Sequence, residues 1–160
     1  MITNTQLAEA FGRNLSILQR QTEGLSHADS LRQPPFRGNC LNWVLGHMAE
    51  SRDSTLKALG VAPSSGEAVA RYAGESEPIT ADDASALPLN ELLRLLAASQ
   101  EALAAALGRA TPEDLARELQ VGPRSTTVGA RVFFSYFHET YHVGQTELLR
   151  QLAGANDKVI

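Results

Sequence analysis

The sequence predicts an all-α protein built as an antiparallel four-helix bundle. Four long segments repeat apolar residues at intervals of three and four, which is the spacing of an amphipathic helix. We find no strand-like alternation, no internal repeat and no low-complexity tract. At 160 residues the chain is long enough for one sizeable core. We therefore expect a single domain over residues 1–160, with short connecting helices and a long loop between the second and third long helices.

The first helix is expected to begin at a cap formed by Asn4 or Thr5 and to end near Gly24. Its apolar positions are Leu7, Phe11, Leu15, Leu18 and Leu25. Residues 26–38 form a connector, because two consecutive prolines stop any helix there. His27 lies in this connector, so we expect a solvated histidine rather than a ligand.

The second helix is expected to follow the N-cap Asn39 and to stop at Gly60. It carries His47, one turn after Trp43. Gly46 lowers helix propensity by about 1 kcal/mol relative to alanine, which predicts that another group approaches the backbone closely there. Cys40, in the first turn, is expected to be a small apolar filler.

Residues 61–87 are rich in small and turn-forming residues, as in a loop that covers one end of the bundle. We expect Tyr72 to anchor it, although a surface loop with no role fits the composition nearly as well. The third helix should start at Pro88 and reach Gly108, with a leucine stripe and a structural role. A short helix should follow at Thr111, where a cap, a proline and acidic residues coincide, and Gly122-Pro123 should end it.

The last long helix is expected to open at Thr126 or Thr127 and to end at Gly154. His138 and His142 stand one turn apart on one face. That stripe is expected to point inward and consists of Arg131, Phe134, His138, His142, Gln145, Leu149 and Leu152. Buried imidazoles need partners, so the pair either binds a metal ion or is hydrogen-bonded to neighbouring groups.

His47 supplies a third imidazole from a facing helix. Three neutral histidines with one position left open are typical of a catalytic rather than a structural zinc site. Zinc is therefore the first choice of metal, and nickel or iron is also compatible with imidazole ligands.

The composition indicates which partners to expect. The formal net charge is −4 and the charges are scattered, so nucleic acid is not an expected ligand. No window is apolar enough to span a membrane, and no secretory signal is visible. The single cysteine excludes an intrachain disulfide and fits a reducing compartment, so we expect a cytoplasmic protein.

Two motifs resemble those of the DinB/YfiT-like superfamily. Residues 38–48, GNCLNWVLGHM, look like its signature of tryptophan, three residues and histidine, and residues 138–145, HETYHVGQ, look like its HxxxHxGQ signature. The resemblance extends over nearly the whole chain. It implies a four-helix bundle with a divalent metal held by His47, His138 and His142, and often a homodimer.

Characterised members of that superfamily are metal-dependent transferases or isomerases that use low-molecular-weight thiols. The resemblance therefore implies a small-molecule thiol and an electrophile as substrates, with the metal stabilising the thiolate. Gln145, one turn past His142, is expected to orient a ligand, a bound water or the substrate. Glu139 lies about 100° around the helix from His138 and is expected on the flank, not as the catalytic base.

Two alternatives stay open. His138 to His142 also satisfies HExxH, the zinc hydrolase or peptidase helix in which the glutamate is the base. The extended form of that motif needs glycine at 145 and histidine at 148, whereas the chain has Gln145 and Leu148. The second alternative is a non-catalytic metal-binding or regulatory dimer. A structural zinc usually has four protein ligands, and Cys40 lies about 10.5 Å along the helix from His47, too far to be the fourth.

Overall fold

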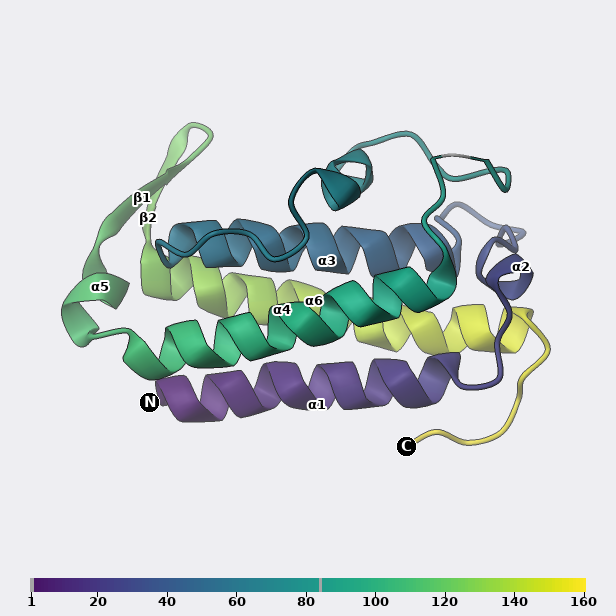
Figure 1. The fold of residues 1–160 in the computed structure, drawn as a ribbon, viewed down its shortest axis with the longest axis horizontal. Helices are drawn as coiled ribbons and strands as arrows, with labels where there is room; N and C mark the ends of the chain where they lie inside the picture. The colour runs from purple at the N-terminus through teal and green to yellow at the C-terminus, as the bar shows by residue number, and fades with distance from the viewer. Residues whose placement is uncertain (1, 84) are drawn as a thin grey trace.

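The computed structural model describes residues 2–83 and 85–160, and within them the chain is mostly helical. Four long helices lie side by side (Figure 1): α1 Asn4–Thr22, α3 Leu41–Ala58, α4 Leu89–Arg109 and α6 Val128–Leu152. The shorter elements are α2 His27–Ser30, the 3-10 helix η1 Gly66–Tyr72, α5 Pro112–Ala116, β1 Glu118–Val121 and β2 Arg124–Thr127. The long helices fall within two residues of their predicted ends.

Hydrogen bonds between the helices give their relative directions. Asn14 and Gln21, in order along α1, contact Glu139 and Glu147, in order along α6, so these two helices run parallel. The helices α3 and α4 also run parallel to each other. The pair α1 and α6 is antiparallel to the pair α3 and α4 (Figure 1). This arrangement requires residues 59–88 to return along the whole length of α3 before α4 begins.

The observed caps refine the predicted helix starts. Thr3, rather than Asn4 or Thr5, caps α1, because its hydroxyl accepts from the Gln6 amide and its own amide donates to Gln6 Oε1. Cys40 takes the cap position of α3 without a side-chain bond, one residue after the expected Asn39. Thr127 caps α6 as expected.

The expectation that no strand is present was wrong. The strands β1 and β2 form an antiparallel hairpin with Glu118 opposite Thr127 and Val121 opposite Arg124. Gly122 adopts a φ of 57°, and Gly122-Pro123 forms the two-residue turn of this hairpin. The pair does not end the short helix, as was expected, because α5 already stops at Ala116. The strands carry little apolar alternation because both are largely exposed, which is why a search for alternation misses them.

A polar layer divides the core of the four long helices. One apolar cluster includes Leu18, Leu45, Leu96 and Val143, and the other includes Phe11, Leu56, Leu103 and Val132. Between them along the chain, each long helix contributes one buried polar residue to a connected network. These residues are Asn14, Arg52, Ser99 and Glu139.

The inward face of α6 differs from the predicted stripe. Phe134, expected inside, is 52% exposed, and His138 is only half-buried. His142 and Leu149 of that stripe are buried as expected, and they share the buried face with Val132, Ser135, Glu139, Val143, Thr146 and Arg150. The prediction placed Glu139 on the flank, whereas here hydrogen bonds and ion pairs let Glu139 and Arg150 occupy the core face. His138 therefore lies at the edge of the core, whereas His142 is buried in it.

No helix in the described ranges, 2–83 and 85–160, is long and apolar enough to cross a membrane.

Candidate metal centre

The three histidines singled out from the sequence meet at one place. His47 comes from α3, and His138 and His142 come from successive turns of α6. One ring nitrogen from each lies within 4.8 Å of the other two. The packing of α3 against α6 therefore brings together residues that are about 90 positions apart in the sequence.

His47 is held on two sides. Its Nδ1–H donates to the backbone carbonyl of Tyr72 over 2.9 Å, and its ring stacks on Trp43 at 4.8 Å between centroids. The Trp43 indole N–H donates in turn to Ser76 Oγ. A carbonyl oxygen can only accept, so the hydrogen of His47 sits on Nδ1 and the lone pair of Nε2 is free for a metal.

His142 is oriented in the same way by its own helix. Its Nδ1 lies 3.0 Å from Gln145 Oε1, which accepts the Nδ1 hydrogen and leaves the Nε2 lone pair free. That Nε2 lies 3.2 Å from His138 Nε2. Gln145, which we expected to orient a ligand, water or substrate, contacts the candidate metal ligand itself.

Burial keeps the pair on α6 uncharged at neutral pH. The pKa of His138 is lowered from 6.5 to about 4, first by burial and then by repulsion from His142, His47 and Arg131. The pKa of His142 is also lowered, mainly by burial, against the opposing effects of the Gln145 hydrogen bond and of Glu139. Metal binding requires neutral imidazoles, so both residues are in the right protonation state.

The spacing of the two α6 imidazoles fits one divalent metal ion. Two imidazole nitrogens bound to one tetrahedral zinc at 2.0–2.1 Å stand about 3.3 Å apart. The observed separation of the two α6 nitrogens is 3.2 Å. The second nitrogens of His47 and His142 have the carbonyl and amide partners that metal-bound histidines usually have. The three residues could therefore hold a metal and leave coordination positions for other ligands.

The prediction that something approaches Gly46 closely is confirmed. A Cβ atom at this position would overlap the ring of Tyr72. Tyr72 is fully buried, its hydroxyl donates to Asn42 Oδ1, and it accepts from the Leu87 amide. Tyr72 thus anchors the 61–87 segment, as expected, and its carbonyl fixes His47.

Asp53 anchors the same segment at its start, and the sequence reasoning missed it. This buried carboxylate accepts from the backbone amides of residues 64, 65 and 66 and from the Ser64 hydroxyl. An aspartate on the buried side of a helix, followed shortly by Ser-Ser-Gly, was the available signal. Asp53 binds the start of the segment that carries Tyr72, and the missing side chain at Gly46 lets the Tyr72 ring pack closely on α3.

Glu139 lies on the core face, not on the flank. It is 2% exposed and forms a bidentate ion pair with Arg52, and Asn14 also donates to it. A carboxylate with these partners is not free to activate a water beside the histidines. The glutamate of the HExxH pattern therefore has a structural role here.

The two other residues considered from the sequence lie outside the cluster. Cys40 is fully buried, with its thiol 3.5 Å from the Ile79 carbonyl, as an apolar filler would be. His27 Nε2 lies 3.2 Å from Asp82 Oδ1 at the surface.

The fold and the site together define a mostly helical protein with a three-histidine cluster able to bind a metal ion. The chain belongs to the DinB superfamily, whose family model matches residues 10–146. This confirms the resemblance drawn from the two motifs.

A solved structure supports the fold. The crystal structure of a conserved protein from Enterococcus faecalis aligns with a TM-score of 0.77 over 98% of this chain and 99% of that chain, at 19% sequence identity. At this identity the likeness speaks to the fold alone. Among curated proteins, no relative matches the sequence.

Proposed function

We propose that the protein is a metal-dependent enzyme whose divalent ion is held by His47, His138 and His142. Zinc is the first choice, with nickel or iron also compatible with the ligand set. The observation that carries the proposal is the convergence of three imidazole nitrogens, with the Nδ1 atoms of His47 and His142 hydrogen-bonded to the Tyr72 carbonyl and the Gln145 side chain. We infer that the domain is a single four-helix bundle over residues 1–160, acting in the cytoplasm.

The reaction proposed is transfer of a low-molecular-weight thiol to an electrophile, or a thiol-assisted isomerisation. A bound metal would stabilise the substrate thiol as its thiolate, which is the reactive form. The chain's own residues orient the site: Gln145 fixes His142, and Trp43 with the Tyr72 carbonyl fixes His47. Phe134 and Tyr141, both exposed, pack against the two α6 histidines and offer apolar surface to a substrate.

The two alternatives are less well supported. A hydrolase of the HExxH type needs Glu139 as a base, and this carboxylate is buried against Arg52. A purely structural metal normally has four protein ligands, whereas the described cluster holds three residues. A non-catalytic metal-binding dimer would keep the metal and show no turnover.

A homodimer is the assembly proposed. Exposed apolar residues recur at intervals of four and seven along α6, on the side away from the core. They are Phe133, Phe137, Tyr141 and Leu148. An apolar stripe of this kind on one helix suits a self-complementary interface between two copies of the chain. It runs beside the histidines, so a second copy would border the substrate side of the site.

Turnover measurements test the enzymatic proposal. Thiol consumption is followed with a panel of small thiols and electrophiles, using zinc-loaded protein, metal-stripped protein and the His138→Ala variant. The matched control is His27→Ala, which changes a surface histidine outside the cluster. We expect activity only in the zinc-loaded wild type and in the zinc-loaded His27→Ala control. Stoichiometric metal without turnover for any pair would instead support the binding-module alternative.

A further inference from the structure

Two surface hollows meet at Arg131. One, of about 270 Å³, lies between the hairpin and α3, and the other, of about 250 Å³, lies between the hairpin and α6. Lys57 lines the first, Arg124 lines the second, and Arg131 lines both. No aspartate or glutamate is among the lining residues of either. In a chain of net charge −4, this is a locally positive surface.

Arg131 has no acidic partner within the described part of the chain. Four other arginines, Arg32, Arg52, Arg94 and Arg150, form ion pairs there. The guanidinium of Arg131 makes only a 3.4 Å contact with Ser54 Oγ and lies over the Phe134 ring at 5.8 Å. Its remaining N–H groups are available to an anion.

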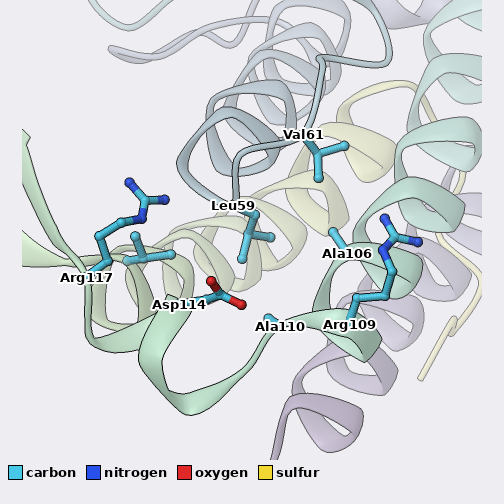
Figure 2. A pocket seen from close by; sticks show the side chains of 8 residues that line it. Leu59, Val61, Ala106, Arg109, Ala110, Asp114 and Arg117 are labelled. Atoms are coloured by element: carbon cyan, nitrogen blue, oxygen red, sulfur yellow. The ribbon is translucent and has the colours of Figure 1, made fainter.

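Another arginine-lined pocket gives the contrast. Arg109 and Arg117 line the pocket at the end of α4, but the carboxylate of Asp114 lines it too (Figure 2). Arg117 also donates to the Ala58 carbonyl. That pocket contains its own counter-charge, whereas the hollows at Arg131 do not.

Arg131 lies close to the histidine cluster along the same helix. It precedes His138 by seven residues, or about 10 Å along the helix axis. Phe134 lies between them along the helix, and its exposed ring is 5.8 Å from the guanidinium carbon of Arg131 and 6.0 Å from the stacked His138 imidazole, measured from the ring centroid. A molecule reaching from the cluster to Arg131 would cross this apolar ring.

We propose that Arg131 binds a carboxylate of the substrate while the other end of that substrate reaches the three histidines. The inference rests on the proposed function for the position of the reacting end, and it adds the class of molecule. The substrate is an elongated acid with an apolar middle that covers Phe134. A guanidinium binds a carboxylate through two parallel hydrogen bonds, and the aromatic ring beneath keeps the guanidinium plane in place.

The test compares two probes that differ in one charge. Binding of 8-mercaptooctanoate and of 8-mercaptooctan-1-ol is measured by calorimetry on zinc-loaded wild type, Arg131→Gln, Arg131→Lys and the control Arg109→Gln. We expect the acid to bind about tenfold more tightly than the alcohol to the wild type and the control, as a charge-assisted hydrogen bond implies. The ratio should fall to near one in Arg131→Gln and be partly kept in Arg131→Lys. Circular dichroism verifies that each variant is folded.

The same titrations on metal-stripped protein, with octanoate and octan-1-ol, separate the two proposals. If the preference for the acid persists there and depends on Arg131, while zinc adds nothing to thiol binding, the carboxylate site stands and the proposed function fails. If zinc increases the affinity for both thiols equally, and acid and alcohol bind alike, the carboxylate site is wrong and the proposed function is unaffected. The carboxylate site is also overturned if the ratio of acid to alcohol affinity is unchanged in Arg131→Gln, or if the acid does not bind to the wild type.

Discussion

Arg52 and Glu139 form a bidentate ion pair at the centre of the molecule. Arg52 Nε donates to Glu139 Oε2 over 2.6 Å and Nη2 donates to Oε1 over 2.9 Å, and both residues are at most 2% exposed. The remaining guanidinium N–H groups donate to the Leu96 and Phe11 carbonyls and to Ser99 Oγ. The pair joins α3 to α6 beside His138, so it sets the register that brings His47 opposite the two other histidines.

Breaking this pair should destabilise the fold strongly. Glu139→Leu leaves the Arg52 charge buried without a partner, and we expect a loss of about 3–5 kcal/mol in the free energy of unfolding, measured in urea. The double variant Arg52→Met, Glu139→Leu should recover much of that loss, because neither charge remains. The exposed pair of Glu91 and Arg94 provides the control, and Glu91→Gln should leave stability nearly unchanged. A single variant as stable as wild type would contradict the structural role of Glu139.

Gly46→Ala should disturb the metal site through the loop. The added methyl overlaps the Tyr72 ring, so the segment must move or α3 must shift, at an expected cost of about 1–3 kcal/mol. Because the Tyr72 carbonyl fixes His47, metal affinity should fall as well. Gly108→Ala is the control, since nothing lies within 4 Å of the new methyl. It should be neutral or stabilising, as alanine favours helix. Equal metal affinity in both variants would refute the link from Tyr72 to His47.

Replacing Gln145 should weaken metal binding without removing it. Gln145→Leu deletes the acceptor of the His142 Nδ1 hydrogen, and the loss of such a partner typically lowers metal affinity about 10- to 100-fold. Gln145→Glu keeps an acceptor oxygen and should bind metal at least as tightly as the wild type. Competition with a chromophoric chelator measures both. If the leucine variant matched the wild type, Gln145 would have to act on substrate or water instead.

The metal-free protein should lose stability as the pH falls from about 6.5 to about 4. The pKa of His138 is about 4 when folded and near 6.5 when unfolded, so the unfolded chain binds more protons in this window. Stability from the neutral imidazole is fully present above pH 6.5 and is lost as the pH falls toward 4. The lowered pKa of His142 acts in the same direction. Melting temperatures of wild type and His138→Asn across this range test the prediction, because the variant should show a shallower decline.

Phe137→Glu should dissociate the proposed dimer. Phe137 is 62% exposed in the middle of the α6 stripe, and a charge there would be buried without a partner in the interface. Light scattering after size exclusion should give a dimer for wild type and a monomer for the variant. Phe36→Glu, at a similarly exposed phenylalanine in the connector before α3, should stay dimeric. A monomeric wild type at micromolar concentration would remove the dimer proposal.

The histidine cluster was within reach of the sequence because it depends on helical spacing. His138 and His142 share a face on any helix, and Gly46 next to His47 marked the close approach of Tyr72. The rotation of α6 about its own axis could not be predicted from the sequence. Its core face carries Glu139, whose burial depends on an arginine 87 positions earlier, and hydrophobic periodicity contains no information on such a pair. The hairpin was not predicted because a Gly-Pro pair is as typical of the end of a helix as of a tight turn, and Gly122-Pro123 was interpreted as a helix end.

The central claim is that His47 joins His138 and His142 around one metal ion. The direct measurement is metal content per chain by elemental analysis, on tag-free wild type and on His47→Ala. We predict close to one equivalent of a divalent metal in the wild type and a large loss in the variant. Metal retained in full by His47→Ala would contradict the three-histidine site, and absence of metal from both proteins, even after reconstitution, would show that the histidines are ordinary core residues.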